Sequence, residues 1–98
     1  MSGPIWATTI LVFFGGLSMV ILRRQLLAML LGLELMISAV NIALVYHAGL
    51  FGDAQGFAAA LLILAVAAAE AVVGLSLILQ LHRAGKPVDA AALTELRG

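Results

Sequence analysis

Apolar residues along the chain fall into three long runs that are separated by short polar segments. The runs cover residues 5–22, 26–46 and 57–81, so their lengths are 18, 21 and 25 residues. A helix that crosses the hydrocarbon core of a bilayer needs about 20 residues, at ~1.5 Å of rise each. The pattern therefore predicts an all-α membrane protein with three transmembrane helices, in which residues 1–98 form a single membrane domain.

The first run does not have the layout of a cleavable leader. Residues 1–4 carry no Lys or Arg, and Arg23 and Arg24 follow the apolar run instead of preceding it. A signal peptide has the reverse order of charge and apolar residues. We therefore expect the first run to be retained as a membrane span.

The basic residues between and after the runs predict an orientation. Arg23 and Arg24 lie between the first two runs, Arg83 and Lys86 follow the third, and the loop 47–56 has no Lys or Arg. Short loops that are rich in Lys and Arg stay in the cytoplasm. The first loop and the C-terminus are thus expected to be cytoplasmic, and the N-terminus and the loop 47–56 to be outside, in the periplasm.

The loop 47–56 and the tail 82–98 carry further local signals. The loop has three glycines and Asp53, which suits a turn in which Asp53 caps the third helix. In the cytoplasmic tail, Lys86-Pro87 is expected to end the third helix, and Asp89 could cap a short helix. Two interpretations of the tail stay open: a frayed surface segment, or a segment that docks three apolar side chains on a neighbouring subunit, namely Val88, Leu93 and Leu96.

Composition agrees with a membrane protein and narrows the chemistry. Hydrophobic residues make up 64% of the chain and charged residues 10%, whereas soluble domains are about half apolar and about a quarter charged. The formal net charge is zero, so there is no basic field to attract nucleic acid. There is no cysteine, and His47 and His82 lie far apart at segment ends. We expect no metal site, no cofactor bound by this chain and no self-contained catalytic centre.

Two acids, Glu34 and Glu70, interrupt the second and third apolar runs. Eleven Leu, Ile and Val residues in 26–46 favour insertion by about −5 kcal/mol, while an ionised acid at mid-span costs about +3 kcal/mol. The span still inserts, but Leu or Ala would insert better. Intramembrane acids are functional by default, so these two residues are the candidate site.

The two acids are expected to lie at similar depths. Glu34 is eight residues from Leu26 and Glu70 is eleven residues from Leu81, which are the predicted cytoplasmic ends of their spans. At ~1.5 Å per residue these separations are about 12 Å and about 17 Å. Both carboxyl groups thus lie near the membrane midplane, within roughly 5 Å of each other in height.

Polar and small residues accompany the acids. Ser38 and Asn41 follow Glu34 at i+4 and i+7, on one side of the helix, and are candidate polar support for it. Such residues more often form hydrogen bonds between helices than transfer protons directly. Alanines flank Glu70, and small residues let another helix approach closely.

Proton transfer is the functional hypothesis for the acids, and a protonated carboxyl that only sets helix register is the structural alternative. In general, burial raises the pKa of a carboxyl group and a nearby cation lowers it again, so such a group can load and release a proton. The three runs contain no Lys, Arg or His, so a counter-charge must come from another chain. Three helices are too few to enclose a pathway, which predicts a subunit of a larger hetero-oligomeric assembly.

Three segments resemble a known family: LGLELMISAVNIALV at 31–45, AVAAAEAVVGLSLILQ at 65–80 and ELRG at 95–98. They are similar to the small three-helix subunit K of proton-pumping NADH:quinone oxidoreductase, respiratory complex I, which is called 4L in mitochondria. The resemblance covers nearly the whole chain, including the basic first loop and the basic exit after the third span.

The resemblance implies a role within the membrane arm of that complex. It implies that Glu34 and Glu70 transfer protons along the path that couples quinone reduction to proton translocation, and that Arg23 and Arg24 anchor the cytoplasmic end. It further implies a non-catalytic subunit in the bacterial cell inner membrane, beside the antiporter-like and quinone-site-proximal subunits. NADH, FMN, iron–sulfur clusters and quinone would then belong to the complex and not to this chain.

Other functions remain as alternatives. The corresponding small subunit of a multisubunit cation/proton antiporter or membrane-bound hydrogenase shares the architecture, but the pair of acids argues against it. A homo-oligomeric transporter would favour aromatic residues around the acid, and 30–41 and 65–75 contain none. A purely structural membrane subunit is the remaining alternative.

Overall fold

The computed structural model describes residues 2–88, which form three helices joined by two short turns. Helix α1 is Gly3–Leu22, α2 is Leu26–Phe51 and α3 is Ala54–Arg83. Pro4 lies in the first turn of α1, where its missing N–H breaks no helical hydrogen bond. All three helices are long and apolar enough to cross a membrane. The predicted all-α class and its three candidate spans are confirmed.

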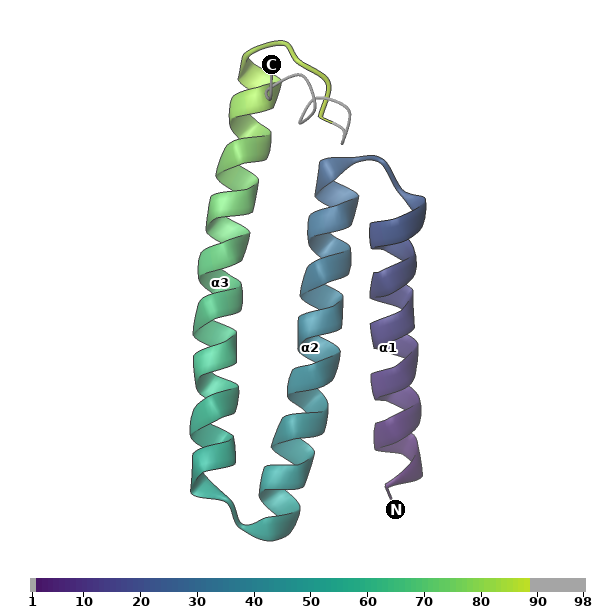
Figure 1. Cartoon of the computed structure of the whole chain (residues 1–98), viewed down its shortest axis with the longest axis vertical. Helices are drawn as coiled ribbons and strands as arrows, with labels where there is room; N and C mark the ends of the chain where they lie inside the picture. The colour runs from purple at the N-terminus through teal and green to yellow at the C-terminus, as the bar shows by residue number, and fades with distance from the viewer. Residues whose placement is uncertain (1, 89–98) are drawn as a thin grey trace.

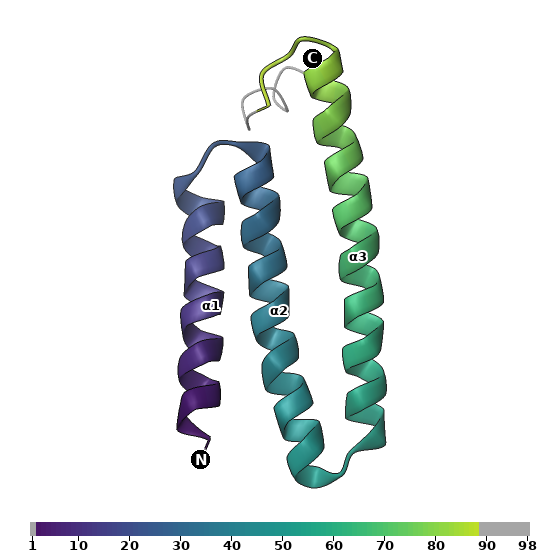
Figure 2. The ribbon, with the colours of Figure 1, turned by 180° about the vertical axis from the view of Figure 1, so that it is seen from behind.

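Helix α2 lies between α1 and α3, as Figures 1 and 2 show from opposite sides. The turn between α1 and α2 and the end of α3 lie at one end of the molecule, and the N-terminus and the turn between α2 and α3 lie at the other. The molecule is elongated, with extents of 50 × 24 × 19 Å. The basic residues of the first turn and of the α3 exit therefore share one end, as the charge pattern predicted.

Backbone contact between two glycines holds α1 against α2. A Cβ atom built on Gly16 would lie 2.5 Å from the carbonyl oxygen of Gly32, and one built on Gly32 would lie 2.5 Å from that of Gly16. Ala39 of α2 is completely buried. Small residues thus bring the two helices together, which is the usual way in which membrane helices pack.

The contact between α2 and α3 also relies on small side chains. A Cβ on Gly56 would lie 2.8 Å from the Cβ of Ala48, and one on Gly74 would lie 3.0 Å from Leu30 Cδ1. Large apolar side chains instead point outward, for example Leu11 and Leu22, which are 73% and 77% exposed. Since these side chains are not buried within the chain, lipid or other subunits must cover them.

The connection between α2 and α3 is much shorter than the predicted loop 47–56. Helix α2 continues to Phe51 and α3 begins at Ala54, because Gly52 is the one glycine of this loop that takes a left-handed conformation, with φ of 58°. The N–H of Asp53 donates to the Ala48 carbonyl at 2.9 Å. The Asp53 side chain accepts from the Gln55 N–H at 3.0 Å, which confirms the predicted cap.

Gly85, rather than Lys86-Pro87, ends α3. The helix stops at Arg83, and Gly85 has a φ of 71°. The N–H of Lys86 donates to the Leu81 carbonyl at 3.0 Å and the N–H of Gly85 to the His82 carbonyl at 3.1 Å, as in a Schellman motif. The turn at Gly85 thus provides hydrogen-bond donors for carbonyl groups of the last turn of α3, and the helix ends before Pro87.

The described part of the tail folds back on its own chain. The half-buried Val88 has its carbonyl oxygen 3.2 Å from the N–H of Leu26, which begins α2. Gln25 makes no side-chain cap there, so the tail provides the acceptor. Leu93, Leu96 and the helix expected from Asp89 lie outside the described residues.

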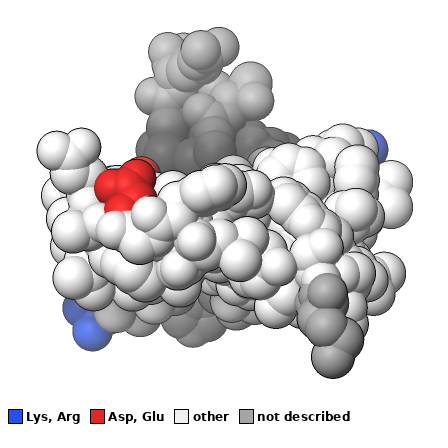
Figure 3. Space-filling view, turned by 90° about the horizontal axis from the view of Figure 1, so that it is seen from below, with Lys and Arg blue, Asp and Glu red and all other residues white. Residues whose placement is uncertain are grey.

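Aromatic rings gather at the end of the molecule that holds the α2–α3 turn. The rings of Trp6 and His47 meet edge to face at 5.3 Å, and Tyr46 and Phe51 lie next to the same histidine. Figure 3 views this end and shows a surface that is mostly uncharged, with one small acidic area and with basic atoms only at its edges. Aromatic belts of this kind are typical of the membrane–water interface.

Candidate functional site

Glu34 and Glu70 line the same groove between α2 and α3. The groove has a volume of about 480 Å³. Its other lining residues are apolar: Leu30, Leu33, Val66, Ala69, Val73 and Gly74. The structure thus brings together the two acids that the sequence placed at similar depths.

One carboxyl oxygen of Glu34 has no hydrogen-bond partner within residues 2–88. The residue is half-buried, and its Oε1 atom is buried and accepts no hydrogen bond within residues 2–88. Leaving a buried acceptor unpaired costs about 1–3 kcal/mol, and more for a charged group. The arrangement therefore leaves a buried acceptor on α2 that residues 2–88 do not satisfy.

Glu70 is more open than Glu34. It is exposed on α3 and also lines a second, smaller groove of about 300 Å³ with Ile37 and Ile63. Gly74, one helical turn further along α3, leaves space in which the side chain of Leu30 lies. Glu70 can therefore be reached both from the shared groove and from a neighbouring groove on the same chain.

The shared groove contains no basic side chain. Arg23 and Arg24 are exposed in the turn between α1 and α2, and Arg83 is exposed at the end of α3. Leu26, where α2 begins, is eight residues from Glu34, which is about 12 Å along the helix axis, and both arginines precede it. No basic side chain of residues 2–88 therefore lies in the groove with the two acids.

Ser38 and Asn41 do not line the groove of the acids. They line another groove of about 500 Å³, together with Ile5 of α1, Leu64 of α3 and further residues of α2. Their spacing puts them on one side of α2 with Glu34, but α1 and α3 both border α2, so residues on one side of it face different spaces. The buried Oε1 of Glu34 accepts no hydrogen bond from either residue, and polar support of Glu34 by this pair stays a prediction.

Tyr46 also lines this groove, a position that the sequence pattern did not predict. It is the one tyrosine of the chain and lies at the end of the second apolar run. Tyr46 is five residues from Asn41, and this spacing does not predict that the two side chains lie on the same face of a helix. The one signal in the sequence that points to Tyr46 is its hydroxyl group, because a buried tyrosine hydroxyl usually has a hydrogen-bond partner.

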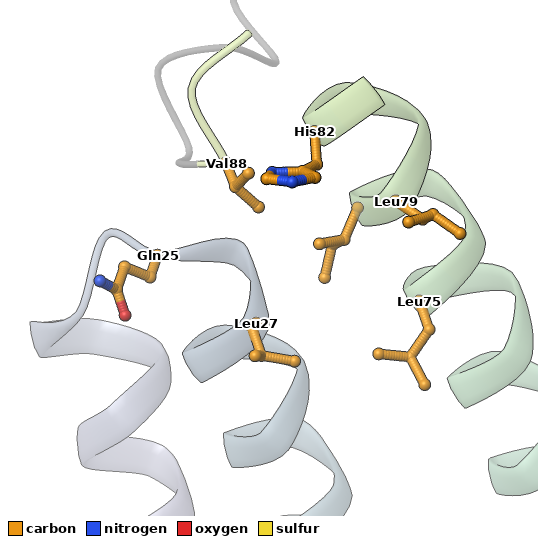
Figure 4. Close-up of a pocket in the computed structure, with 7 residues that line it drawn as sticks. Gln25, Leu27, Leu75, Leu79, His82 and Val88 are labelled. Carbon is orange, nitrogen blue, oxygen red and sulfur yellow. The ribbon is translucent and has the colours of Figure 1, made fainter. Parts of the chain in front are cut away.

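A larger groove of about 810 Å³ lies at the other end of the molecule, where α2 begins and α3 ends. Figure 4 shows its side chains, which come from the turn before α2, from α2, from α3 and from the tail: Gln25, Leu27, Leu75, Ile78, Leu79, His82 and Val88. It contains no carboxyl group, and His82 is its one titratable side chain. In the described part of the chain, no three His, Asp or Glu residues come together as metal ligands.

Comparison with known protein families adds to this geometry. The family of NADH-ubiquinone/plastoquinone oxidoreductase chain 4L matches residues 4–98. The chain belongs to this family. Chain 4L is the K subunit of complex I, so the protein is a multi-pass membrane subunit of a multisubunit oxidoreductase. The match includes all of α2 and α3, and therefore the groove with both glutamates.

Proposed function

We propose that this 4L chain contributes Glu34 and Glu70 to the proton-transfer path that couples quinone reduction to proton translocation. The observation that carries the proposal is the shared groove, which holds two carboxyl groups and no basic side chain from residues 2–88. The buried Oε1 of Glu34 has no donor there. A carboxyl group in such a place exchanges protons with whatever donor a neighbouring subunit or water provides.

The chain acts as a non-catalytic subunit in this proposal. It binds no redox cofactor itself, and NADH, FMN, iron–sulfur clusters and quinone act elsewhere in the complex. The antiporter-like and quinone-site-proximal subunits are the proposed neighbours. Outward-facing apolar side chains, such as Leu61 and Val72 on α3, support contact with other membrane helices or lipid.

The proposed orientation places the end with Arg23 and Arg24 in the cytoplasm. Arg83 and Lys86 lie at the same end, and the opposite end has Asp53 in its turn. Basic residues near short loops favour the cytoplasmic side. For a bacterial complex this puts the N-terminus and the α2–α3 turn in the periplasm, with the chain in the inner membrane.

The direct test replaces Glu34 by Gln in the complete complex. Gln has nearly the same shape but no titratable proton, so we expect proton translocation and NADH–quinone turnover to fall while the complex still assembles. The measurement is turnover and proton uptake by vesicles that contain the purified complex.

Asp53→Asn is the matched control. It also changes a carboxyl to an amide, but at a helix cap outside both grooves, where Asn caps about as well as Asp. We expect full activity in this control. If Glu34→Gln and the double variant with Glu70→Gln also keep full activity, only a structural role remains for the two acids.

A further inference from the structure

The groove where α2 begins and α3 ends is polar at one end and apolar along the rest. Its α3 wall has four residues at i, i+3, i+4 and i+7, namely Leu75, Ile78, Leu79 and His82. This spacing puts them on one side of the helix, with Leu75 about 10 Å along the axis from His82. Figure 4 shows His82 and Val88 at the end nearest the tail, and Leu27 and Leu75 further along the helices.

The tail forms a third wall of this groove. The half-buried Val88 lines it, and its carbonyl oxygen accepts from the N–H of Leu26 at 3.2 Å. This bond ties the chain after α3 to the beginning of α2. Leu27 and Leu75 are 44% and 50% exposed, so the groove opens on the outer surface of the molecule.

Basic side chains surround the polar end of the groove. Three lining residues have a basic residue close by in the chain: Gln25 follows Arg24, His82 precedes Arg83, and Val88 follows Lys86 by two residues. All three basic side chains are exposed. The acids of residues 2–88 lie elsewhere, in the groove of Glu34 and Glu70 and in the turn at the opposite end. In the sequence, the first turn and residues 82–98 together have five basic and two acidic residues.

We propose that this groove binds an anionic phospholipid, with an acyl chain against Leu27 and Leu75 and the phosphate at the basic end. Basic pockets between membrane helices bind anionic head groups. The His82 imidazole and the Gln25 amide each supply an N–H donor for a phosphate or ester oxygen. The proposal does not depend on proton transfer, because the groove shares no lining residue with that of the two acids.

A lipid fits the groove better than a helix of a neighbouring subunit. Membrane helices approach one another over small residues, and this chain does so at Gly16, Gly32 and Gly74. Among the described residues, the lining of the groove includes no Gly, Ala, Ser or Thr, and five of its seven residues are Leu, Ile or Val. A flexible acyl chain can follow such branched side chains, whereas a free anion would leave them uncovered.

The first test measures lipid contact in the complete complex. The purified complex is placed in phosphatidylcholine vesicles that contain, as the minor component, phosphatidylglycerol with a photoactivatable acyl chain. Mass spectrometry then locates the adducts. We expect them on the segments of α2 and α3 that line the groove, and fewer with a phosphatidylcholine probe of the same acyl chain. Equal labelling by the two probes, or none in the groove, would overturn the proposal.

The second test removes charge beside the groove. One basic residue near a membrane surface changes the affinity for anionic lipid about fivefold. We therefore expect Arg83→Gln and Lys86→Gln each to lower phosphatidylglycerol labelling of the groove about fivefold, while phosphatidylcholine labelling stays the same. Unchanged phosphatidylglycerol labelling in the double variant would contradict recognition of the head group.

The third test narrows the apolar wall. Leu75→Trp places a bulky ring where the acyl chain is expected, so labelling of the groove should fall. Leu77→Trp is the matched control, because Leu77 lies on the same helix, is 56% exposed and does not line this groove. Full labelling in Leu75→Trp, or an equal loss in Leu77→Trp, would place the lipid elsewhere.

A structure of the wild-type complex decides the question even if the Trp variants do not assemble. We expect acyl-chain density between Leu27 and Leu75, with a phosphate or ester oxygen within about 3.2 Å of His82 or Gln25. A helix of a neighbouring subunit, or residues 89–98, in the groove would overturn the proposal. If Glu34→Gln leaves coupling intact, the proposed function fails, and this lipid density is unaffected.

Discussion

At the scale of single residues, Glu34 and Asn41 share an uncommon feature: each has a buried oxygen without a hydrogen-bond donor in the described chain. Unpaired buried polar atoms are rare in complete structures because water or protein normally satisfies them. Both residues lie on α2, the helix that is packed on two sides. Residues 2–88 therefore supply no hydrogen-bond donor at these two positions.

Glu70 differs from Glu34 in exposure, and this difference predicts unequal effects of substitution. We expect Glu70→Gln to reduce proton-coupled turnover less than Glu34→Gln, because the more open Glu70 borders two grooves and leaves room for water or partner groups to replace it. Initial rates of proton uptake for the two variants, at equal amounts of assembled complex, measure the ranking. An equal or greater loss in Glu70→Gln would contradict it.

At the scale of the elements, contact between glycines decides how α1 and α2 pack. The carbonyl oxygens of Gly16 and Gly32 each occupy the space where the other residue would have a Cβ. Since backbone atoms cannot turn away as a flexible side chain does, this contact tolerates no larger residue without separation of the helices. The contact between Gly74 and the end of the Leu30 side chain is less demanding for the same reason.

This contact predicts that Gly16→Ala destabilises the α1–α2 pair. The new methyl group would lie 2.5 Å from the Gly32 carbonyl oxygen, and overpacking of this kind typically costs 1–3 kcal/mol. We expect a lower midpoint of thermal disassembly of the complex. Gly15→Ala is the matched control, because nothing lies within 4 Å of its Cβ position; a similar loss of stability in this variant would show that the contact is not the cause.

At the scale of the whole molecule, the two ends differ in charge and in aromatic content. The basic residues Arg23, Arg24, Arg83 and Lys86 gather where α2 begins and α3 ends, and the rings of Trp6 and His47 meet at the opposite end. An asymmetric distribution of this kind sets how a multi-pass chain inserts.

The proposed orientation predicts which end an impermeant reagent reaches. The chain has no cysteine, so Gln25→Cys and Asp53→Cys each introduce a unique thiol in this subunit. In intact cells we expect a membrane-impermeant maleimide to label Asp53→Cys and to leave Gln25→Cys unlabelled until the membrane is opened. Labelling of Gln25→Cys from outside, with Asp53→Cys protected, would reverse the orientation.

Local patterns in the sequence were enough for the class of the molecule. The lengths of the apolar runs determined three helices, because backbone hydrogen bonds must be satisfied within each segment that crosses a membrane. The role of Asp53 as a helix cap follows from the same local chemistry. The expected loop 47–56 was wrong in length, since several glycines permit a turn but only Gly52 makes one.

The sequence by itself determined which residues are costly in a membrane: two carboxyl groups, near the same depth, on two antiparallel helices. Only the tertiary structure decided which side chains share a space. It brought Glu34 and Glu70 to one groove and assigned Ser38 and Asn41 to another. The physical reason is that helical periodicity fixes the side of a helix on which a residue lies, whereas the packing of neighbouring helices fixes what that side faces. Gly16 and Gly32 set this packing between α1 and α2, and Gly56 and Gly74 set it between α2 and α3.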